Sequence, residues 1–373
     1  MPDPAILHHA ARVVGLAIAG TPADQALRES LTAGRHFTAP VARRAISRAV
    51  FAYFRWWRWL APKDSLPKQL AAALDLQDRF NRDPAAIKAE ALAARAVPDW
   101  LKAEMEAVPT ALLVQFQQEP ALWIRAKAGT GVDLARRLSH LVPAPQSADA
   151  LRYLGTTDLY RTKEFQAGAF EIQDLASQLV GLACAPQPGE TWWDACAGEG
   201  GKTLHLSDLM QNKGLIWASD RSERRLTRLK ERAARAQVFN FRAAAWDGGP
   251  RLPTRTKFDG ILVDAPCSGI GTWQRNPHAR WTTQPSDVHE LAAVQRKLLD
   301  HVAGSLRPGG RLVYSVCTLS RAETTAVAGA FTAAHPELEP VALSSLSTPH
   351  PSLFLWPHEL NANGMFLAAW RYR

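Results

Sequence analysis

Two cysteines of this chain stand where short apolar runs end. Cys267 belongs to the segment Asp-Ala-Pro-Cys-Ser-Gly, which begins at Asp264, and Cys317 directly follows the run Arg-Leu-Val-Tyr-Ser-Val. A thiolate is a nucleophile, and the carboxyl ends of strands are where open α/β sheets bind ligands. The other two cysteines, Cys184 and Cys196, fit the usual role of a small buried apolar residue. Because no Cys-x-x-Cys pair occurs, we expect free thiols and neither a zinc site nor a disulfide framework.

A glycine-rich turn follows another apolar run and precedes a helical pattern. Residues 194–203 read Asp-Ala-Cys-Ala-Gly-Glu-Gly-Gly-Lys-Thr, and glycines there let the backbone approach a ligand closely. A Walker A loop ending at Gly201-Lys202-Thr203 would need a glycine at position 196, where Cys196 stands. A dinucleotide-binding loop would need a glycine in place of Thr203. Both phosphate-binding motifs are therefore incomplete.

Acidic residues at two further run ends suit an adenosyl group. Asp220 closes the second run and can accept hydrogen bonds from both ribose hydroxyls, whereas Asp247, after the third, can accept from an adenine amino group. Ribose and adenine without basic residues for phosphates indicate S-adenosylmethionine as the cofactor. The alternative is that both carboxylates cap helices.

A nucleophilic thiol near a methyl donor suits one reaction in particular. Carbon 5 of cytosine cannot take up a methyl group until a thiolate adds at carbon 6 and produces an enamine-like intermediate. An acid near ring nitrogen 3 helps that addition, and Asp264 is placed for this role, for which its pKa would have to be raised. A base must then remove the carbon 5 proton so that the thiol can leave.

The elements that would position these residues alternate between strands and helices. From about residue 166 to residue 373, apolar runs at 191–195, 215–218, 258–263 and 311–316 are separated by amphipathic helical patterns. This alternation predicts an α/β domain with a doubly wound, mostly parallel, Rossmann-like sheet covered on both faces.

The front of the chain has different patterns. Residues 1–92 read as an all-helical domain, with Ile6, Ala10, Val13 and Ala17 on one helical face. Residues 97–165 read as a small α+β module, in which 122–125 is strand-like. Because single cores seldom grow much past ~250 residues, the length of 373 residues suits such a division.

Charge is compatible with a polyanionic partner. The formal net charge is +9, and no acidic residue occurs between Glu29 and Asp64. Basic and aromatic residues gather in that interval and could neutralise phosphates and stack on bases, or the aromatics could form the core face of a helix whose arginines face water. These residues are Arg35, Arg43, Arg44, Arg48, Phe51, Tyr53, Phe54, Arg55, Trp56, Trp57, Arg58, Trp59 and Lys63.

Nothing in the sequence indicates a membrane or a secretory signal. No uncharged apolar run reaches about 18 residues, and the N-terminus carries Asp3 where a signal peptide would carry basic residues. We therefore expect a cytoplasmic protein without membrane attachment or metal.

The motifs as a set resemble the Sun/Fmu (Nop/Sun) family of RNA 5-methylcytosine methyltransferases, over nearly the whole chain. Residues 194–203 resemble the family's first cofactor motif, 264–269 its Asp-Ala-Pro-Cys-Ser-Gly motif, and 314–318 the strand with its second cysteine, while 271–281 also follow its pattern. The resemblance implies a seven-stranded class I methyltransferase fold.

The resemblance also implies roles for individual residues. Cys317 would attack carbon 6, Cys267 would assist product release, and Asp264 would contact the cytosine edge and the surroundings of the cofactor. The residues implied to bind S-adenosylmethionine are Cys196, Ala197, Gly198, Glu199, Gly200, Gly201, Lys202, Asp220, Arg225, Asp247 and Asp264.

A narrower resemblance concerns the RNA target. Residues 43–60 and 98–101 are similar to the bacterial 16S rRNA methyltransferase B group, whose helical domain resembles the antitermination factor NusB. This implies ribosomal RNA as the partner and a monomer; tRNA or another RNA, or a non-catalytic assembly factor, are the alternatives. A small-molecule methyltransferase would have no use for the basic, aromatic stretch.

The chain departs from the family pattern at two places. It has Gly198-Glu199 where the family has Ala-Pro, and Asn363-Gly364-Met365-Phe366 where the family has Asp-Gly-Phe-Phe. Neither departure touches the reacting groups. We expect the first to alter cofactor affinity.

Overall fold

The computed structural model describes residues 3–33 and 39–373, and the chain divides into two compact units. One unit combines Met1–Pro120 with Gly269–Pro285, and the other combines Ala121–Ser268 with Ser286–Arg373. The boundaries 1–92, 97–165 and 166–373 drawn from the sequence remain predictions. Each unit is described by itself.

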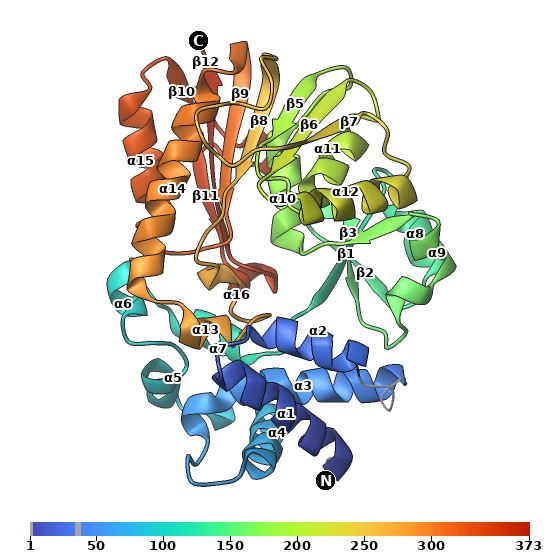
Figure 1. The fold of residues 1–373 in the computed structure, drawn as a ribbon, viewed down its shortest axis with the longest axis vertical. Helices are drawn as coiled ribbons and strands as arrows, with labels where there is room; N and C mark the ends of the chain where they lie inside the picture. Colours follow the sequence, from blue (N-terminus) through green and yellow to red (C-terminus); the bar gives the residue numbers. More distant parts are fainter. Residues whose placement is uncertain (1–2, 34–38) are drawn as a thin grey trace. The chain divides into compact units, whose positions relative to one another are not determined.

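The first unit is helical (Figure 1). Its first helix begins behind Asp3, whose side chain accepts a hydrogen bond from the N–H of Ala5, and it buries Ala10, Val13 and Ala17 on one face, as the spacing predicts. Helices continue to residue 117. They are α1 (Pro4–Ile18), α2 (Ala23–Ala33), α3 (Pro40–Trp56), α4 (Leu66–Arg82), α5 (Ala89–Arg95), α6 (Leu101–Glu104), α7 (Thr110–Gln117) and α13 (Ala279–Thr282).

The segment 269–285 is built into this helical unit through a buried arginine. Arg280 is 0% exposed and donates hydrogen bonds to the carbonyl oxygens of Ala96 (2.7 Å), Phe116 (2.8 Å) and Trp273 (3.3 Å), and to Gln117 Oε1 (2.8 Å). Multiple acceptors are what a buried guanidinium requires. The chain thus leaves the second unit after Ser268 and returns to it at Ser286.

The second unit opens with a small antiparallel sheet in the order β2-β3-β1-β4. The predicted strand at 122–125 is present as β1, and its Ile124 packs with Leu151 and Phe170 in a local core. The elements are β1 (Leu122–Ala126), α8 (Gly131–Arg137), β2 (Leu141–Ala144), β3 (Ser147–Tyr153), α9 (Lys163–Gln166) and β4 (Phe170–Ile172).

The larger sheet of the second unit confirms the predicted mostly parallel α/β architecture. Its order is β10-β12-β9-β8-β5-β6-β7, and β11 pairs with β12 beside this path. Strands β5 to β9 are parallel, whereas β10, β11 and β12 join them as an antiparallel edge. They are β5 (Thr191–Asp194), β6 (Leu215–Asp220), β7 (Phe241–Ala245), β8 (Phe258–Asp264), β9 (Leu306–Val316), β10 (Leu338–Pro340), β11 (Ser352–Leu355) and β12 (Met365–Tyr372).

Helices cover both faces of this sheet (Figure 1). Side chains alternate between faces along a strand, so the neighbours Trp192 and Trp193 on β5 enter different cores. Trp193 packs in the core that includes residues of α14 and α15, and Trp192 packs in the core that includes residues of α10 and α11. The helices are α10 (Leu175–Cys184), α11 (Gly201–Leu209), α12 (Glu223–Ala236), α14 (Pro285–Ala303), α15 (Thr325–Ala334) and α16 (Pro357–Leu360).

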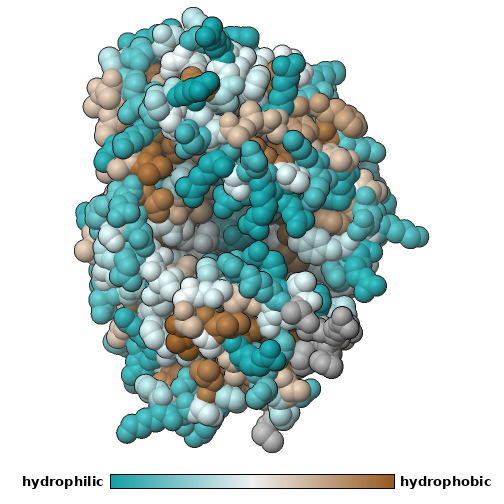
Figure 2. All heavy atoms as spheres, viewed as in Figure 1, coloured by the Kyte–Doolittle hydropathy of each residue, from teal (hydrophilic) through white to brown (hydrophobic). Residues whose placement is uncertain are grey.

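The surface is largely hydrophilic on the face that Figure 2 shows, with apolar residues in separate patches. Within the described residues, no helix combines the length and apolar character that crossing a membrane would require. Across residues 3–33 and 39–373, no group of three or more His, Cys, Asp or Glu side chains is arranged to hold a metal ion.

Candidate active site

The two cysteines named from the sequence meet at the carboxyl edge of the parallel strands. Strands β8 and β9 are neighbours in a register that pairs Asp264 with Ser315, and Cys267 and Cys317 follow shortly after these positions. Their sulfur atoms lie 3.2 Å apart. Neither cysteine forms a disulfide, and both are partly buried. Two sulfur atoms are therefore close enough to contact the same small ring.

A lysine and an aspartate form an ion pair at this site. Lys202 Nζ lies 2.6 Å from Asp264 Oδ2, and the hydroxyl of Ser315 donates to Asp264 Oδ1 at 2.7 Å. Burial opposes the charged form of Lys202, but Asp264, with smaller contributions from Cys317 and Asp194, raises the pKa of Lys202 above its ordinary value. Asp264 accepts both hydrogen bonds. The raised pKa of Lys202 favours its protonated form beside Asp264, and the proton-donor role that the sequence suggested for Asp264 remains a prediction.

The glycine-rich turn adopts conformations that explain its glycines. Gly198 has a φ of +55° and Gly200 a φ of +85°, a region that side chains disfavour. A Cβ at Gly200 would also come within 2.6 Å of Leu229 Cγ. The N–H of Gly198 donates to Asp220 Oδ2 at 3.0 Å, so the turn is fastened to the end of β6. A Cβ at Gly198 would meet open space, which leaves room for a ligand beside the turn.

The two predicted ligand carboxylates both lie at this edge. Asp220 is buried and accepts from the N–H of Ser222 at 2.8 Å, and Arg225 Nη1 lies 3.9 Å from its Oδ2. Asp247 is exposed and accepts the N–H of Gly249 at 2.8 Å, within a turn. The capping side chain of α12 is that of Ser222, so Asp220 is not the cap of that helix.

The remaining residues of the turn differ in their exposure. Burial, together with the nearby carboxylate of Asp194, raises the pKa of Cys196, which disfavours its thiolate form. Ala197 is buried and its N–H donates to the carbonyl of Ser219 at 2.8 Å, while Glu199 is exposed. The turn can therefore contact a ligand mainly through its backbone groups, and Lys202 adds a charged side chain.

The sequence matches a family described as "16S rRNA methyltransferase RsmB/F" over residues 181–371. The chain belongs to this family. It is 36% identical over 233 residues to "Probable ribosomal RNA small subunit methyltransferase B" of Bacillus subtilis (strain 168), which covers 60% of the chain and 52% of that relative. It is 31% identical over 289 residues to "Ribosomal RNA small subunit methyltransferase B" of Salmonella arizonae, covering 73% and 65%. The chain therefore spans about half to two thirds of the length of the curated relatives that it matches.

Solved structures share the fold. The crystal structure of PH0851 superposes with a TM-score of 0.80 at 22% identity, covering 99% of each chain. The structure of NSun6 from Pyrococcus horikoshii with SFG superposes with a TM-score of 0.61 at 20% identity, covering 70% of this chain and 93% of that one. These likenesses support the methyltransferase fold expected from the sequence.

In this RsmB/F family member, the glycine-rich turn is held by residues to which the sequence assigned no role at the cofactor site. Arg232 of α12 donates to the carbonyl of Glu199 at 3.0 Å and to Glu171 Oε2 at 2.9 Å. Gln173 Nε2 donates to the carbonyl of Gly201 at 3.3 Å. Glu171 and Gln173 belong to the small α+β part of the second unit, which is therefore tied to the turn. Spacing alone gives no signal for such a long-range contact.

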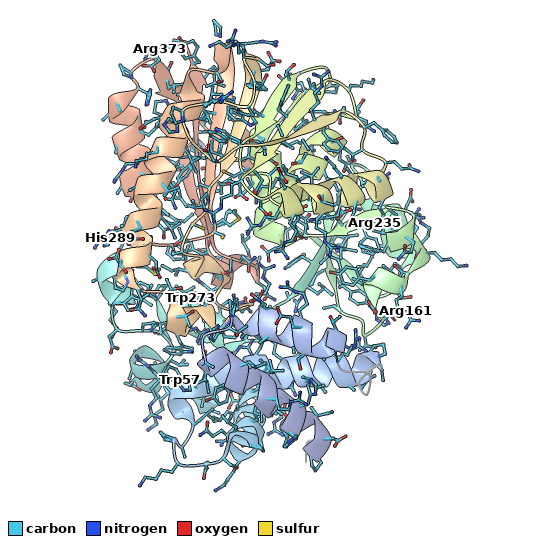
Figure 3. The ribbon with its side chains drawn as sticks, in the orientation of Figure 1. Trp57, Arg161, Arg235, Trp273, His289 and Arg373 are labelled. Atoms are coloured by element: carbon cyan, nitrogen blue, oxygen red, sulfur yellow. The ribbon has the colours of Figure 1, made fainter. Side chains whose placement is uncertain are left out.

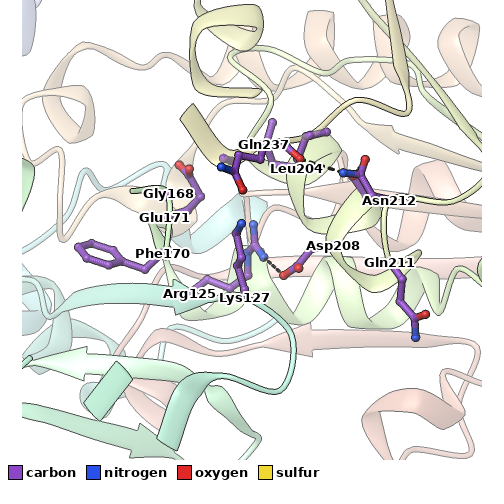
Figure 4. A pocket seen from close by; sticks show the side chains of 13 residues that line it. Arg125, Lys127, Gly168, Phe170, Glu171, Leu204, Asp208, Gln211, Asn212 and Gln237 are labelled. Carbon is purple, nitrogen blue, oxygen red and sulfur yellow. Dashed lines mark hydrogen bonds and ion pairs between the residues drawn. The ribbon is translucent and has the colours of Figure 1, made fainter. Parts of the chain in front are cut away.

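A pocket of about 190 Å³ lies between β1, β4 and the ends of α11 and α12 (Figure 4). Arg125 Nη1 lies 2.8 Å from Asp208 Oδ2, and Glu171 is paired with both Arg232 and Arg235, the latter labelled in Figure 3. Most of the charge around this pocket is therefore already paired. We assign the pocket to the packing of the small sheet against the helices, because the thiols do not line it.

Sequence reasoning also missed Glu323, which is fully buried near the thiols. Its spacing from Ser320 matches the Ser-x-x-Glu pattern of a helix start, and the N–H of Glu323 does donate to the hydroxyl of Ser320, at 3.4 Å, before α15. That pattern could have marked the residue, but not the direction of its carboxylate.

The aromatic residues of the basic stretch in the helical unit form mostly core. Tyr53, Phe54 and Trp56 are buried, as one of the two interpretations of this stretch expected. Trp57 is 46% exposed (Figure 3), and its ring packs edge-to-face on Trp281 with centroids 5.3 Å apart. Trp57 is therefore an aromatic side chain of this stretch that remains accessible for stacking.

Some arginines of the stretch form hydrogen bonds and ion pairs within the chain. Arg55, expected to face water, is 2% exposed. Its guanidinium donates hydrogen bonds to Gln77 Oε1 and to the carbonyl oxygen of Gln274 inside the helical unit. Arg48 pairs with Asp78 and Glu119, each at 2.5 Å. Arg35 lies outside the described residues.

Proposed function

We propose that this chain transfers a methyl group from S-adenosylmethionine to carbon 5 of a cytidine in RNA, through a covalent bond between Cys317 and carbon 6. The observation that carries the proposal is the 3.2 Å separation of the Cys267 and Cys317 sulfur atoms at the carboxyl edge of the sheet. Membership of the 16S rRNA methyltransferase RsmB/F family supports it.

The proposed cofactor suits the residues at the glycine-rich turn. Residues 196–202 would hold it with their backbone. Asp220 would accept hydrogen bonds from its ribose hydroxyls, and Asp247 would accept a hydrogen bond from its adenine amino group. Arg225 would be a further residue of this site. The fit rests on the buried Asp220 carboxylate and on the open space beside Gly198. When bound, this cofactor supplies an electrophilic methyl group. The structure of NSun6 from Pyrococcus horikoshii, which shares this fold, is solved with SFG.

The side chains around the two thiols would each have a role in the proposed reaction. The Cys317 thiolate would add to carbon 6 of cytosine and push negative charge onto the ring, which Lys202 could stabilise by donating to the ring edge. Asp264 would accept a hydrogen bond from the exocyclic amine of the cytosine. After carbon 5 has taken up the methyl group, a base would take the carbon 5 proton, and the electrons of that carbon–hydrogen bond would restore the ring double bond as the sulfur–carbon bond breaks and the Cys317 thiolate leaves. Cys267 would assist this release.

The substrate that best suits the chain is 16S ribosomal RNA. Its relatives in Bacillus subtilis and Salmonella arizonae are named for the small ribosomal subunit. We also propose that the NusB-like helical domain at 1–92 and the module at 97–165 bind RNA, and that the protein works as a cytoplasmic monomer. A tRNA or another RNA is the alternative substrate.

The proposal can be tested in cells that carry this chain and in cells from which it has been deleted. Bisulfite sequencing should show a cytidine of 16S rRNA that resists conversion only when the protein is present. A deletion strain complemented with Cys317→Ala should lose this protection entirely, because the variant has no nucleophile at carbon 6. Cys184→Ala, which alters a buried cysteine of α10, is the matched control and should restore the protection.

Two results would contradict the proposal. Full protection by the Cys317→Ala variant would exclude Cys317 as the nucleophile. Protection that disappears from a tRNA, while 16S rRNA is unchanged, would exclude the ribosomal target and favour the alternative substrate.

A further inference from the structure

A buried carboxylate lies next to the loops that carry the two thiols, and the proposed reaction gives it no step. Glu323 is 0% exposed and precedes α15. An ionised carboxylate is costly to bury unless several donors satisfy it. The donors around Glu323 therefore identify the parts of the chain that it holds together.

Those donors come from both thiol loops. Glu323 Oε1 accepts the N–H of Ser268 at 2.8 Å, and Oε2 accepts the hydroxyls of Ser268 and of Thr318, the latter at 3.1 Å. The oxygens of these two hydroxyls lie 2.9 Å from each other. Because Ser268 directly follows Cys267 and Thr318 directly follows Cys317, one carboxylate ties the two loops together.

Further hydrogen bonds hold the same loop from its other side. Gln295 Nε2, on α14, donates to Glu323 Oε1 at 3.0 Å and to the carbonyl of Pro266 at 2.9 Å. The hydroxyl of Tyr314 lies 2.9 Å from Gln295 Oε1 and 2.7 Å from the carbonyl oxygen of Glu323. Cys267 is thus fixed through the residues before and after it.

We propose that Glu323 is a positioning residue that sets the distance between Cys267 and Cys317, so that one thiol can add to a ring while the other acts on the same ring. This inference rests on the proposed two-thiol reaction. Effective catalysis depends on sub-ångström placement, and a misplacement of about 1 Å can cost ~100-fold in rate. No chemical step passes through Glu323 itself.

The test measures the distance between the thiols without RNA or cofactor. Phenylarsine oxide bonds two neighbouring thiols through one arsenic atom and releases water, so its affinity reports their proximity. The full-length protein should bind one equivalent tightly, and Cys317→Ala should not. Glu323→Gln places an amide donor among donors that need an acceptor, so we expect its affinity to fall by about 10-fold or more because the second thiol is no longer held in place.

Methyl transfer gives the second readout. In Glu323→Gln we expect kcat to fall ~100-fold while KM for RNA is unchanged, because the thiols are displaced and the RNA-binding surface is not. Glu323→Asp keeps the carboxylate and should recover part of both the affinity for the arsenical and kcat.

A matched pair of variants covers the case in which Glu323→Gln does not fold. Thr318→Val removes the donor that ties the Cys317 loop, whereas Ser320→Ala removes another hydroxyl that donates to Glu323 Oε2 at 2.9 Å but adjoins neither thiol. A positioning role predicts weaker arsenical binding for Thr318→Val only. Equal effects of the two substitutions would overturn the proposal.

The two readouts separate this inference from the proposed function. Wild-type affinity for the arsenical in folded Glu323→Gln would overturn the positioning role, whatever the methylation result. If the arsenical distinguishes the variants as expected but the wild-type protein methylates no RNA, the positioning of the thiols is supported and the proposed function is rejected.

Discussion

At the scale of single residues, the strand end beneath the glycine-rich turn holds a carboxylate with little solvation. Asp194 is fully buried, and its Oδ2 accepts the hydroxyl of Thr203 at 2.6 Å. Within the described residues its Oδ1 has no hydrogen-bond partner. Burial raises the pKa of Asp194 to about 7, although the hydrogen bond from Thr203 acts in the opposite direction.

This raised pKa predicts a pH dependence of stability. Between about pH 4 and pH 7 the folded state keeps a proton on Asp194 that the unfolded chain has lost. The free energy of unfolding therefore falls as pH rises through this range, by at most about 1.4 kcal/mol per pH unit. Above pH 7 the contribution of Asp194 no longer changes, because both states have lost the proton. Asp194→Asn has no such titration. We expect its free energy of unfolding to improve relative to wild type from pH 5 to pH 8, measured by denaturant unfolding. A difference that does not change with pH would contradict this.

The sequence predicted which residues meet at the strand ends better than it predicted the contacts that hold them there. Cys267, Cys317 and Asp264 sit in motifs at strand ends, and parallel strands bring such ends together. The pairing of Lys202 with Asp264 and the inward turn of Glu323 depend on side-chain directions, which spacing along the chain does not encode.

At the scale of elements, a side chain of one strand packs directly against the backbone of the neighbouring strand. Gly260 of β8 lies against Trp192 of β5, and a Cβ on this glycine would come within 2.3 Å of the indole ring. Trp192 is almost fully buried, so it has little room to move.

Gly260→Ala should therefore destabilise the second unit, by about 1–3 kcal/mol if the ring can shift and by more if it cannot. The matched control is Gly329→Ala in α15, where a Cβ meets nothing within 4 Å, and which should be neutral or slightly stabilising. Denaturant unfolding followed by tryptophan fluorescence would measure both. Similar unfolding midpoints for the two variants would refute the expected clash.

The arrangement of elements was predictable where the pattern is local. Short apolar runs alternating with amphipathic helices indicated parallel strands and helices on both faces, and the structure has both. The antiparallel edge formed by β10, β11 and β12 was not predicted, because the direction in which a strand joins a sheet depends on contacts between distant segments.

At the scale of the whole molecule, the chain order and the two units do not coincide. Residues 269–285 belong to the helical unit although they lie between two parts of the other unit. Their amino-acid pattern matched a family motif but gave no sign of where the segment packs. The buried Arg280, with its several acceptors from residues 96–117, shows the physical reason.

Replacing this arginine should weaken the helical unit. Arg280→Lys keeps the charge but cannot reproduce the planar fork of donors, so buried acceptors are left unsatisfied, at a cost of about 3 kcal/mol. Arg82→Lys, at an exposed position of α4, is the control and should change stability by less than ~0.5 kcal/mol. Thermal unfolding would show the difference, and equal Tm values for the two variants would contradict the structural role of Arg280.

The most direct test of the reaction is to isolate its covalent intermediate. The Cys267→Ala variant, mixed with substrate RNA and S-adenosylmethionine, should accumulate a protein–RNA species that survives denaturing electrophoresis, because Cys317 can still add to carbon 6 while release is impaired. Mass spectrometry of the digested species should locate the nucleotide on Cys317, and the Cys267→Ala, Cys317→Ala double variant should form none. Absence of the species, or attachment of the nucleotide to any other residue, would contradict the mechanism.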